Sequence, residues 1–304
     1  MSSFSRAIVL IMLAILLFDA QGAIIKHLGG RYSVPQIATF RNIFGLIPSI
    51  LMLLLSSSWR SGRRSLKLPQ WKIALLRGLC IALAQFFFYW SLTVMEFATA
   101  STLAFAGPLF ITTLSVPILG HHVGLVRWLA VLVGFSGIVL VMQPGGDVFQ
   151  TVAILPVVAA FGYGLSSVLV KLFDDGASTA LINLHTTLVT LACSSLLMVG
   201  LDLYQPFASI TDWMWMLAMG IAGGFAVFTM IAAYRLTQPS NLSPFEYFGI
   251  PFSFIIGWVF FAEAPFSKLF PGAFLIAAGG LLIVWRERRR QTTVVTSART
   301  SKRY

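Results

Sequence analysis

The sequence predicts an all-α integral membrane protein with ten transmembrane helices, arranged as two inverted five-helix repeats. Three observations predict this fold. The 304 residues are 58% hydrophobic and only 10% charged, with a mean hydropathy of +0.87, whereas soluble proteins carry about 25% charged residues. Ten apolar stretches of membrane-spanning length follow one another along the chain. The second half repeats features of the first half at a fixed offset of 143 residues.

Each apolar stretch is expected to form a helix. A transmembrane helix needs about 20 mostly apolar residues, and only helices and closed barrels satisfy their backbone hydrogen bonds in lipid. The stretches are continuous and do not alternate with polar residues, which excludes a strand barrel. In chain order, the expected spans are 7–25, 35–57, 71–94, 98–119, 126–143, 151–171, 179–201, 213–234, 243–263 and 268–285.

The internal repeat predicts the topology. Because each half contains an odd number of spans, the second copy enters the membrane upside down, as in many secondary transporters. The expected divisions are a first repeat at 1–145, a second at 146–286 and a basic tail at 287–304. The residues that recur are Phe105, Pro108, Val116, Ala130, Leu132, Gly137 and Val141, which return as Phe248, Pro251, Val259, Ala273, Leu275, Gly280 and Val284.

The positive charges predict the orientation. With a cytoplasmic N-terminus, most of the 21 Lys and Arg residues fall on the cytoplasmic side, whereas Lys26, Arg31 and Lys268 fall outside. We therefore expect a multi-pass protein of the cell inner (cytoplasmic) membrane with both termini in the cytoplasm. The basic tail is interpreted as a topology anchor, with binding of acidic lipid or a partner as the alternative. A cleaved signal peptide is disfavoured, because Asp19 ends the first apolar run without a small-residue cleavage site.

Prolines and small residues predict how the spans pack. Pro108 and Pro251 lie at matched positions inside the fourth and ninth spans, where they indicate either hinges or fixed kinks. Gly220 and Gly224 lie four residues apart on one helix face, which favours close approach of a neighbouring helix. Small residues in the fifth and tenth spans, such as Gly137, predict a packed scaffold there instead of a substrate path.

Arg41, followed by Asn42, is the first candidate for substrate binding. It lies about two turns inside the second span. A guanidinium stays charged and offers a planar set of donors that suits a carboxylate or a phosphate. A permanent ion pair with Asp19 or Glu246 is the alternative.

The third span places Arg77, Gln85 and Tyr89 on one helix face. Gln85 and Tyr89 are expected to reach a ligand near the middle of the membrane. Arg77 is a further candidate for substrate binding. Because it lies close to the start of its span, its side chain could instead extend to the cytoplasmic surface.

Three in-membrane residues are candidates for proton coupling, namely Asp19, His185 and Glu246. Burial raises the pKa of a carboxyl group and a neighbouring arginine lowers it, whereas histidine titrates near neutrality. His185, Glu246 and Tyr247 are also expected at the substrate site. Structural pairing of these charges is the alternative interpretation.

Five short motifs, in their order and spacing within a doubled five-helix unit, resemble the EamA branch of the drug/metabolite transporter superfamily over nearly the whole chain. The resemblance implies a ten-helix carrier that moves a small organic metabolite by alternating access without ATP. The stretch from Arg77 through Tyr247 is most similar to S-adenosylmethionine uptake carriers and riboflavin importers, although amino-acid and drug exporters share much of it. Gly120-His121-His122 departs from the branch, which commonly has an acidic residue there. The motifs are Ala38-Thr39-Phe40-Arg41, Leu76-Arg77-Gly78, Ala98-Thr99-Ala100-Ser101, the stretch 134–140 and Pro244-Phe245-Glu246-Tyr247.

The expected function is a secondary transporter of a small organic metabolite, with riboflavin or S-adenosylmethionine uptake first and export of amino acids or drug-like metabolites as the alternative. An intramembrane enzyme or a channel is less favoured. The sequence contains no H-E-x-x-H, G-x-S-x-G or P-loop motif, so no catalytic residue is expected. Cys80 and Cys193 lie inside spans and predict neither a disulfide framework nor a metal site. We expect no cofactor and no nucleic-acid partner; the expected partners are the substrate and the lipid bilayer, and a homodimer is left open.

Overall fold

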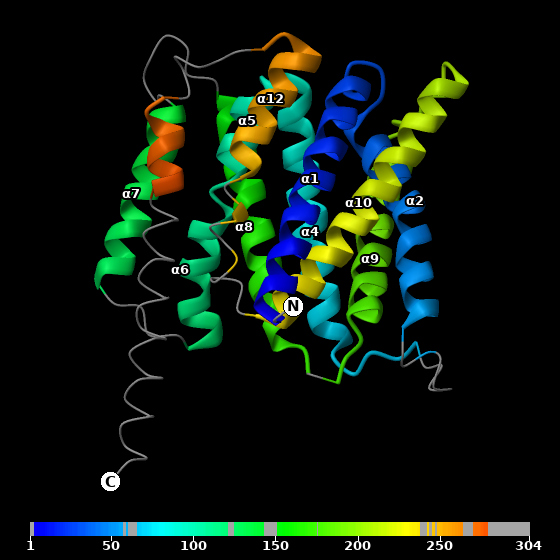
Figure 1. Cartoon of the computed structure of the whole chain (residues 1–304). Helices are drawn as coiled ribbons and strands as arrows, with labels where there is room; N and C mark the ends of the chain where they lie inside the picture. The colour runs from blue at the N-terminus through cyan, green and yellow to red at the C-terminus, as the bar shows by residue number, and fades with distance from the viewer. Residues whose placement is uncertain are drawn as a thin grey trace.

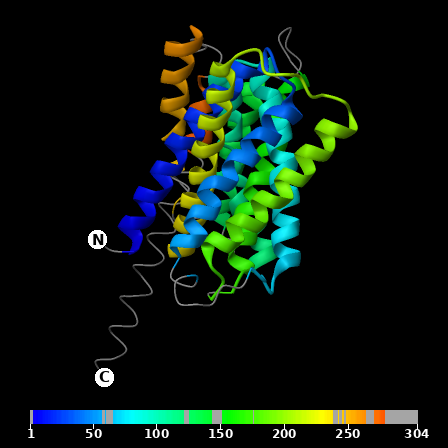
Figure 2. The same ribbon diagram turned by 90° about the vertical axis from the view of Figure 1, so that its right-hand side faces the viewer.

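The computed structural model describes residues 3–56, 59, 66–120, 125–142, 151–174, 176–237, 242, 245–246, 248–263 and 270–278, and the regular structure in these ranges is entirely helical. The helices form one bundle, and their axes run in roughly one direction in both views (Figures 1 and 2). The helices are α1 (Ser3–Gly29), α2 (Val34–Leu55), α4 (Trp71–Val94), α5 (Phe97–Ala104), α6 (Gly107–Leu119), α7 (Leu125–Met142), α8 (Ile154–Leu169), α9 (Thr179–Gly200), α10 (Ile210–Leu236) and α12 (Gly249–Phe261).

The helices agree with the expected spans in position. Short 3-10 turns at Thr151–Ala153 and Val170–Leu172 extend α8, and residues 272–278 are also helical. Seven of the described helical segments are long and apolar enough to cross a membrane, with α5 and α6 counted together as one segment. The all-helical, multi-pass membrane fold is therefore confirmed. Ten crossings stay a prediction, because the fifth, ninth and tenth expected spans are not among these seven. The apolar stretches found in the fifth and ninth, Val131–Val141 and Gly249–Phe261, are shorter than a bilayer crossing, and the tenth is described as helical only over 272–278.

The two ends of the bundle are named here by α1. The Gly29 end, uppermost in Figure 1, is where α1 finishes and α2 begins, and the Ser3 end is opposite. Hydroxyl side chains cap two helices at the Gly29 end, because the first backbone N–H groups of a helix have no partner within it. Ser33 accepts a hydrogen bond from the backbone N of Gln36 at 3.3 Å, and Ser209 accepts one from that of Asp212 at 3.2 Å.

Helices of the first half pack mainly on helices of the second half. α1 lies against α10 and α12, α2 against α9 and α10, and α4 against α8 and α9. Both views show α12, in orange, beside the upper part of α1. Exchanging helices for their repeat counterparts returns several of the main contacts: α1–α10 becomes α8–α4, α2–α10 becomes α9–α4, and α6–α8 becomes α12–α1. A two-repeat architecture fits this packing.

The matched prolines lie just after matched interruptions in two helices. A turn at Phe105–Ala106 separates α5 from α6, and Pro108 lies in the first turn of α6, where its missing N–H costs no helical hydrogen bond. In the second half, a turn at Phe248 precedes α12, and Pro251 is near the start of that helix. The two interruptions touch, since a Cβ added at Gly249 would overlap the ring of Phe105.

Glycines allow α10 to approach α2 closely, as the sequence predicts. A Cβ added at Gly220 would collide with Phe44 of α2, and one added at Gly224 would collide with Pro48. Two helices held this closely by small residues gain van der Waals contact, which is the main attraction available between helices in lipid.

The fifth and tenth spans also meet through glycine. A Cβ added at Gly137 of α7 would lie 2.6 Å from the carbonyl oxygen of Gly272 and 2.8 Å from the backbone N of Ile276. The close packing predicted for these two spans is confirmed at this contact.

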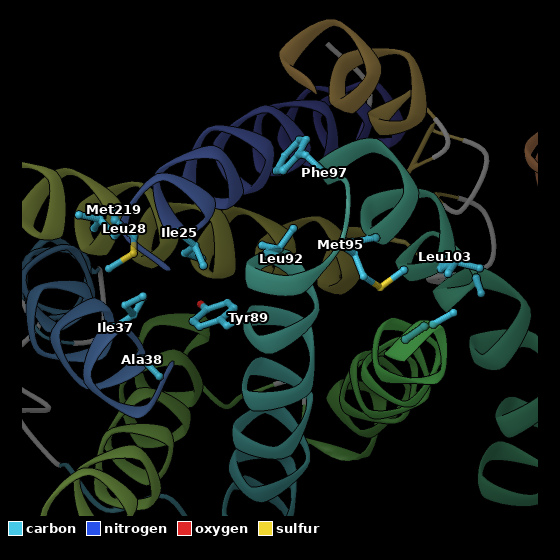
Figure 3. Packing of buried hydrophobic residues seen from close by; sticks show 14 of the residues in the cluster. Ile25, Leu28, Ile37, Ala38, Tyr89, Leu92, Met95, Phe97, Leu103 and Met219 are labelled. Carbon is cyan, nitrogen blue, oxygen red and sulfur yellow. The ribbon is translucent and has the colours of Figure 1, made fainter. Parts of the chain in front are cut away.

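An apolar cluster of α1, α2 and α4 fills the bundle near the Gly29 end. Figure 3 shows Tyr89 extending from α4 toward Ile37 and Ala38 of α2, beside Ile25 of α1. The Tyr89 side chain is 1% exposed. A buried tyrosine hydroxyl needs a hydrogen-bond partner, and that partner belongs to the polar cluster described next.

Candidate functional site

A chain of buried polar side chains crosses the bundle from α1 to α9. We call it the Arg41 cluster. By the helix rise of about 1.5 Å per residue, Arg41 lies about 10 Å below the start of α2. No member is more than 7% exposed. The members are Gln21 of α1, Arg41 and Asn42 of α2, Gln85 and Tyr89 of α4, and Ser194 of α9.

The Arg41 guanidinium donates to two side-chain amides. Its Nε donates to Gln21 Oε1 at 3.1 Å, and its Nη1 donates to Asn42 Oδ1 at 3.0 Å. The other end of the Gln21 amide, Nε2, donates to the hydroxyl of Tyr89 at 3.1 Å. Gln21 therefore joins the arginine to the tyrosine.

Asn42 carries the cluster into the second half of the chain. Its Nδ2 donates to Gln85 Oε1 and to Ser194 Oγ, both at 3.3 Å. Gly223 of α10 lies on the other side of the guanidinium, where an added Cβ would lie 2.6 Å from Arg41 Nε and 2.7 Å from Nη2. Helices of both halves thus enclose Arg41.

No carboxylate pairs with Arg41 among the described residues. The two described salt bridges join Lys26 to Glu263 and Arg31 to Asp212. The alternative that Arg41 pairs permanently with Asp19 or Glu246 is wrong for the described structure, because its hydrogen-bond acceptors are the amide oxygens of Gln21 and Asn42. The cation is buried among neutral acceptors, so its charge is not neutralised by the side chains around it.

Asp19 lies on a different side of α1 from Gln21. Residues two apart on a helix do not share a face, whereas Ile15 and Gly22 flank Asp19 on its own side. Ile15 borders Gly249 of α12, and a Cβ at Gly22 would lie 3.1 Å from the Phe97 ring of α5. Asp19 is 7% exposed, and its Oδ2 has no hydrogen-bond partner within the described ranges. It therefore lies apart from Arg41, on the side of α1 that meets α5 and α12.

Arg77 belongs to a second polar group nearer the Ser3 end. It is 3% exposed, so the alternative that it extends to the surface is wrong. Its Nε donates to the carbonyl oxygen of Ser166 at 3.2 Å, and its Nη1 donates to Thr186 Oγ1 at 2.7 Å. Both partners come from the second half, so Arg77 bridges the two halves through its own hydrogen bonds, whereas Arg41 reaches the second half through Asn42 and through packing on Gly223.

Glu246 is bound by a tyrosine of α10. The Tyr234 hydroxyl donates to Glu246 Oε1 at 2.8 Å, with Glu246 8% exposed and Tyr234 1% exposed. This pair is separate from the Arg41 cluster. Of the candidates named from sequence, Arg41, Asn42, Gln85 and Tyr89 come together, whereas Arg77 and Glu246 lie in other contacts.

His185 and Tyr247 do not add to the Arg41 cluster. His185 Nδ1 is 3.0 Å from the carbonyl oxygen of Leu181, one turn earlier in α9, and its ring is partly exposed. Tyr247 lies outside the described residues. The described hydrogen-bond contact of His185 is therefore with its own helix.

The Gly29 end is held by two ion pairs, each between the two halves. Lys26 Nζ lies 2.8 Å from Glu263 Oε1, and the other oxygen of Glu263 accepts a hydrogen bond from the backbone N of Phe97 at 2.7 Å. Arg31 Nη1 lies 2.8 Å from Asp212 Oδ1, and the Tyr32 hydroxyl donates to Asp212 Oδ2 at 2.8 Å. We call these two pairs the end clamp.

Two residues of the Arg41 cluster were not among the sequence candidates. Gln21 and Ser194 are uncharged, and Gln21 follows the more conspicuous Asp19 by only two residues. A polar amide inside an apolar first span is the signal that points to Gln21. Ser194 gives little signal of its own, because a serine can return its hydroxyl to its helix backbone, as this one also does to Leu191 O.

Comparison with known proteins identifies the family. A sequence profile of the EamA-like transporter family matches this chain twice, over residues 5–143 and 150–285. The chain belongs to the EamA-like transporter family. The resemblance and the transporter function predicted from sequence are confirmed, and the family indicates a transporter as opposed to an enzyme.

Curated relatives of this EamA-like protein match over most of their length. The S-adenosylmethionine uptake transporter of Rickettsia prowazekii (strain Madrid E) is 26% identical over 268 residues, which are 88% of each chain. The riboflavin transporter of Vibrio cholerae is 29% identical over 231 residues, 75% of this chain and 76% of that one. The pseudopaline exporter CntI of Pseudomonas aeruginosa is 25% identical over 287 residues, 91% and 93% of the two chains.

A solved protein structure shares the fold of this EamA-like chain. It superposes with a TM-score of 0.70 at 21% sequence identity and covers 94% of this chain and 98% of its own.

In chemical terms, the Arg41 cluster offers a fixed cation, amide groups and hydroxyls, which can bind an anion or a polar ligand. Within the described ranges, no group of three or more His, Cys, Asp or Glu residues is placed to hold a metal ion.

Proposed function

We propose that this EamA-like protein is a secondary carrier that takes up a small organic metabolite of the S-adenosylmethionine type, with the Arg41 cluster as its substrate site. The relatives named as S-adenosylmethionine uptake transporters support this substrate class, because several match at 24–26% identity over 88–95% of the chain. Riboflavin is the second candidate, supported by relatives of that name.

The observation that carries the proposal is the burial of Arg41 without an anionic partner among the described residues. Removing a charged group from water costs several kcal/mol even after the protein relaxes around it. Proteins usually compensate that cost with an opposite charge. Arg41 is 2% exposed, and its described acceptors are neutral amides. An electrostatically unsatisfied site of this kind favours a ligand that brings its own negative or strongly polar group.

The position of the site suits alternating access. Its contacts join α1, α2 and α4 of the first half to α9 and α10 of the second half. If the halves rock against each other about the Arg41 cluster, access to the site changes from one face of the membrane to the other. The touching interruptions at Phe105–Ala106 and Phe248 are where two helices can bend during this change. The backbone hydrogen bonds there, from Ala106 N to Leu103 O and from Phe248 N to Phe245 O, span three residues instead of the four of an α-helix.

The proposal includes the membrane orientation. The bias of Lys and Arg along the sequence supports a carrier in the cell inner membrane with both termini in the cytoplasm. The Gly29 end, with its end clamp, then faces outward, and the Ser3 end faces the cytoplasm. The inverted repeats are 1–145 and 146–286, followed by the tail.

A binding panel on purified protein tests the proposal. S-adenosylmethionine, riboflavin and amino acids are added separately and the melting temperature is measured. A ligand present at about 100 times its Kd stabilises the folded form by about 2.7 kcal/mol. The ligands that raise the melting temperature are then assayed for uptake into proteoliposomes. If none of them is bound or transported, the proposed substrate class is wrong.

Variants of Arg41 test the location of the site. Arg41→Leu is expected to abolish binding and uptake. Arg41→Lys is expected to retain a small fraction of the wild-type binding and uptake, because lysine keeps the charge but not the planar set of donors. Lys72→Met is the matched control, since it removes a positive charge from the exposed start of α4. Full transport by Arg41→Leu would exclude Arg41 from the site.

Direction is tested in the same vesicles. Relatives include uptake transporters and an exporter, so uptake is the proposal and export is the alternative. Radiolabelled substrate is placed inside or outside proteoliposomes of known protein orientation, under an imposed ion gradient. Accumulation on the side of the Ser3 end supports uptake, and accumulation only on the opposite side supports export.

A further inference from the structure

Gln21 occupies the place where a counter-ion of Arg41 would be expected. Its Oε1 accepts the hydrogen bond from Arg41 Nε at 3.1 Å, and the side chain is 4% exposed. Glutamate has the same length and would put a carboxylate oxygen at the same point. The difference between the two side chains is one NH2 group against one oxygen, so the chain holds the arginine there without neutralising it.

The Gln21 amide also donates a hydrogen bond, which a carboxylate cannot do. Gln21 Nε2 donates to the hydroxyl of Tyr89 at 3.1 Å. Because the Oε1 atom is fixed by the arginine donor, the NH2 group must face Tyr89, and the amide has one orientation. Gln21 therefore holds both the guanidinium plane and the tyrosine in place.

In the part of the chain that the structure describes, the helices around Arg41 supply no anion in place of a counter-ion. From α2 and α4, the side chains of Asn42, Gln85 and Tyr89 are uncharged, and from α9 so is Ser194. From α10, Gly223 brings only backbone to the guanidinium, since a Cβ would lie 2.6 Å from Arg41 Nε.

The nearby acids are engaged or placed elsewhere. Asp19 lies on the side of α1 that meets α5 and α12. Glu246 is bound by Tyr234, and Glu263 is paired with Lys26. The chain therefore places acids beside other groups and an amide beside Arg41.

We propose that the substrate's own carboxylate is the counter-ion of Arg41, and that Gln21 is the residue that sets this preference. This inference rests on the proposed function and narrows its substrate class to small carboxylate-bearing metabolites, with neutral flavins disfavoured. Two hydrogen bonds occupy Nε and Nη1, and a guanidinium has five N–H donors. A carboxylate can engage the remaining edge through two parallel hydrogen bonds.

Matched ligand pairs test the inference on the full-length protein. The probes are S-adenosylmethionine against decarboxylated S-adenosylmethionine, L-methionine against L-methioninamide, and riboflavin alone. Wild type is expected to bind the carboxylate member of a pair at least tenfold more tightly. Equal binding of both members, within threefold, overturns the inference, and so does binding of riboflavin alone. In both cases the transporter function survives. If none of the probes binds, both the proposed function and the inference are wrong.

Variants of Gln21 separate its charge from its shape. Gln21→Glu places a carboxylate beside Arg41 and is expected to weaken binding of the carboxylate ligand at least tenfold while leaving the decarboxylated ligand within threefold. Gln21→Met has similar length but no charge, and is expected to weaken both ligands to a similar extent. The ratio of the two affinities is therefore the decisive readout, since a purely structural role would not change it.

The outcomes are distinguishable. If Gln21→Glu binds the carboxylate ligand like wild type, or if it and Gln21→Met lower the ratio equally, Gln21 does not set the preference. If Gln21→Glu fails to fold, as judged by loss of a cooperative melting transition, the wild-type ligand pairs alone decide whether a carboxylate is required, and Gln21→Met decides whether Gln21 positions Arg41.

Discussion

Gly223→Ala probes the Arg41 cluster through a single methyl group. In most helix interiors this exchange is favourable by about 0.5–1 kcal/mol, because glycine loses more conformational freedom on folding than alanine. At this position the new Cβ would lie 2.6 Å from Arg41 Nε and 2.7 Å from Nη2, and it would also overlap the Oε1 of Gln21. These distances are too short for unbonded atoms, so Gln21 and Arg41 must move.

The expected loss follows from the hydrogen bonds that this movement breaks. The Arg41–Gln21 bond involves a charged donor and is worth about 1.5–3 kcal/mol, and the neutral Gln21–Tyr89 bond about 0.5–1.5 kcal/mol. Subtracting the helix gain of at most about 1 kcal/mol leaves a net destabilisation of about 1–4 kcal/mol. Ligand binding should fall as well, because the guanidinium loses its orientation.

Gly45→Ala is the matched control, because Gly45 also borders Arg41. There an added Cβ would lie 3.4 Å from Gly220 O and 3.8 Å from Arg41 Nη1, which are ordinary contact distances. The control should melt at the wild-type temperature or above it and should keep its ligand affinity. Thermal unfolding in detergent, with and without ligand, measures both variants. The reasoning is refuted if Gly223→Ala is as stable as Gly45→Ala and binds ligand equally well.

Three further predictions concern the acids. Glu263→Gln removes the anion that pairs with Lys26 and should lower the melting temperature. In a background without other cysteines, the same substitution should raise the reactivity of a thiol introduced as Met95→Cys, because Lys26 also donates to the carbonyl oxygen of Met95. Unchanged thiol reactivity would show that the Lys26–Glu263 pair does not close the Gly29 end. Tyr234→Phe removes the donor to Glu246 and should cost about 1.5–3 kcal/mol, measured as a lower melting temperature, and no change would mean that the contact is dispensable. Asp19→Asn should leave uptake intact but independent of the pH gradient, measured with and without a protonophore, if the proton is coupled through that residue. Gradient-dependent uptake by Asp19→Asn would place coupling elsewhere.

The sequence predicts the fold through properties that each segment carries by itself. Apolar run length places α1, α2, α4, α9 and α10 within a few residues of their observed bounds. The matched prolines predict that two helices are disturbed, although the interruption at Phe105–Ala106 lies before Pro108, because proline affects the residues that precede it. Local pattern is sufficient for these features, since burial in lipid and backbone geometry act within one segment.

The polar contacts depend on tertiary structure, and sequence predicts them less well. Asn42, Gln85 and Tyr89 were predicted as substrate contacts together with Arg41, because polar groups at membrane depth usually face a cavity or a partner. The alternative of a carboxylate partner for Arg41 is not found among the described residues, because Asp19 faces another side of α1 and Tyr234 binds Glu246. Which acid meets which base depends on helix rotation and on the other half of the chain.

The contacts of Arg77 and Gln21 also could not be predicted from the sequence. The burial of Arg77 rests on the carbonyl of Ser166 and the hydroxyl of Thr186, two groups that are about a hundred residues away in the chain. Gln21 carries no charge and gives only a weak pattern, and its role follows from its two hydrogen bonds. Such contacts become visible only when the helices are placed together.

If the two halves rock as proposed, we expect the end clamp to make opening at the two ends of the bundle differ in free energy. Lys26–Glu263 and Arg31–Asp212 both tie one half to the other at the same extremity of the bundle, with three of the four side chains at most 20% exposed. Opening of the bundle at the Ser3 end can leave both ion pairs intact, so the two halves can pivot about these pairs. Parting the halves at Gly29 must instead break both ion pairs and expose the more buried Lys26, Glu263 and Asp212 to water. For the alternating access proposed above, we therefore expect the empty carrier to favour the conformation that is closed at the Gly29 end.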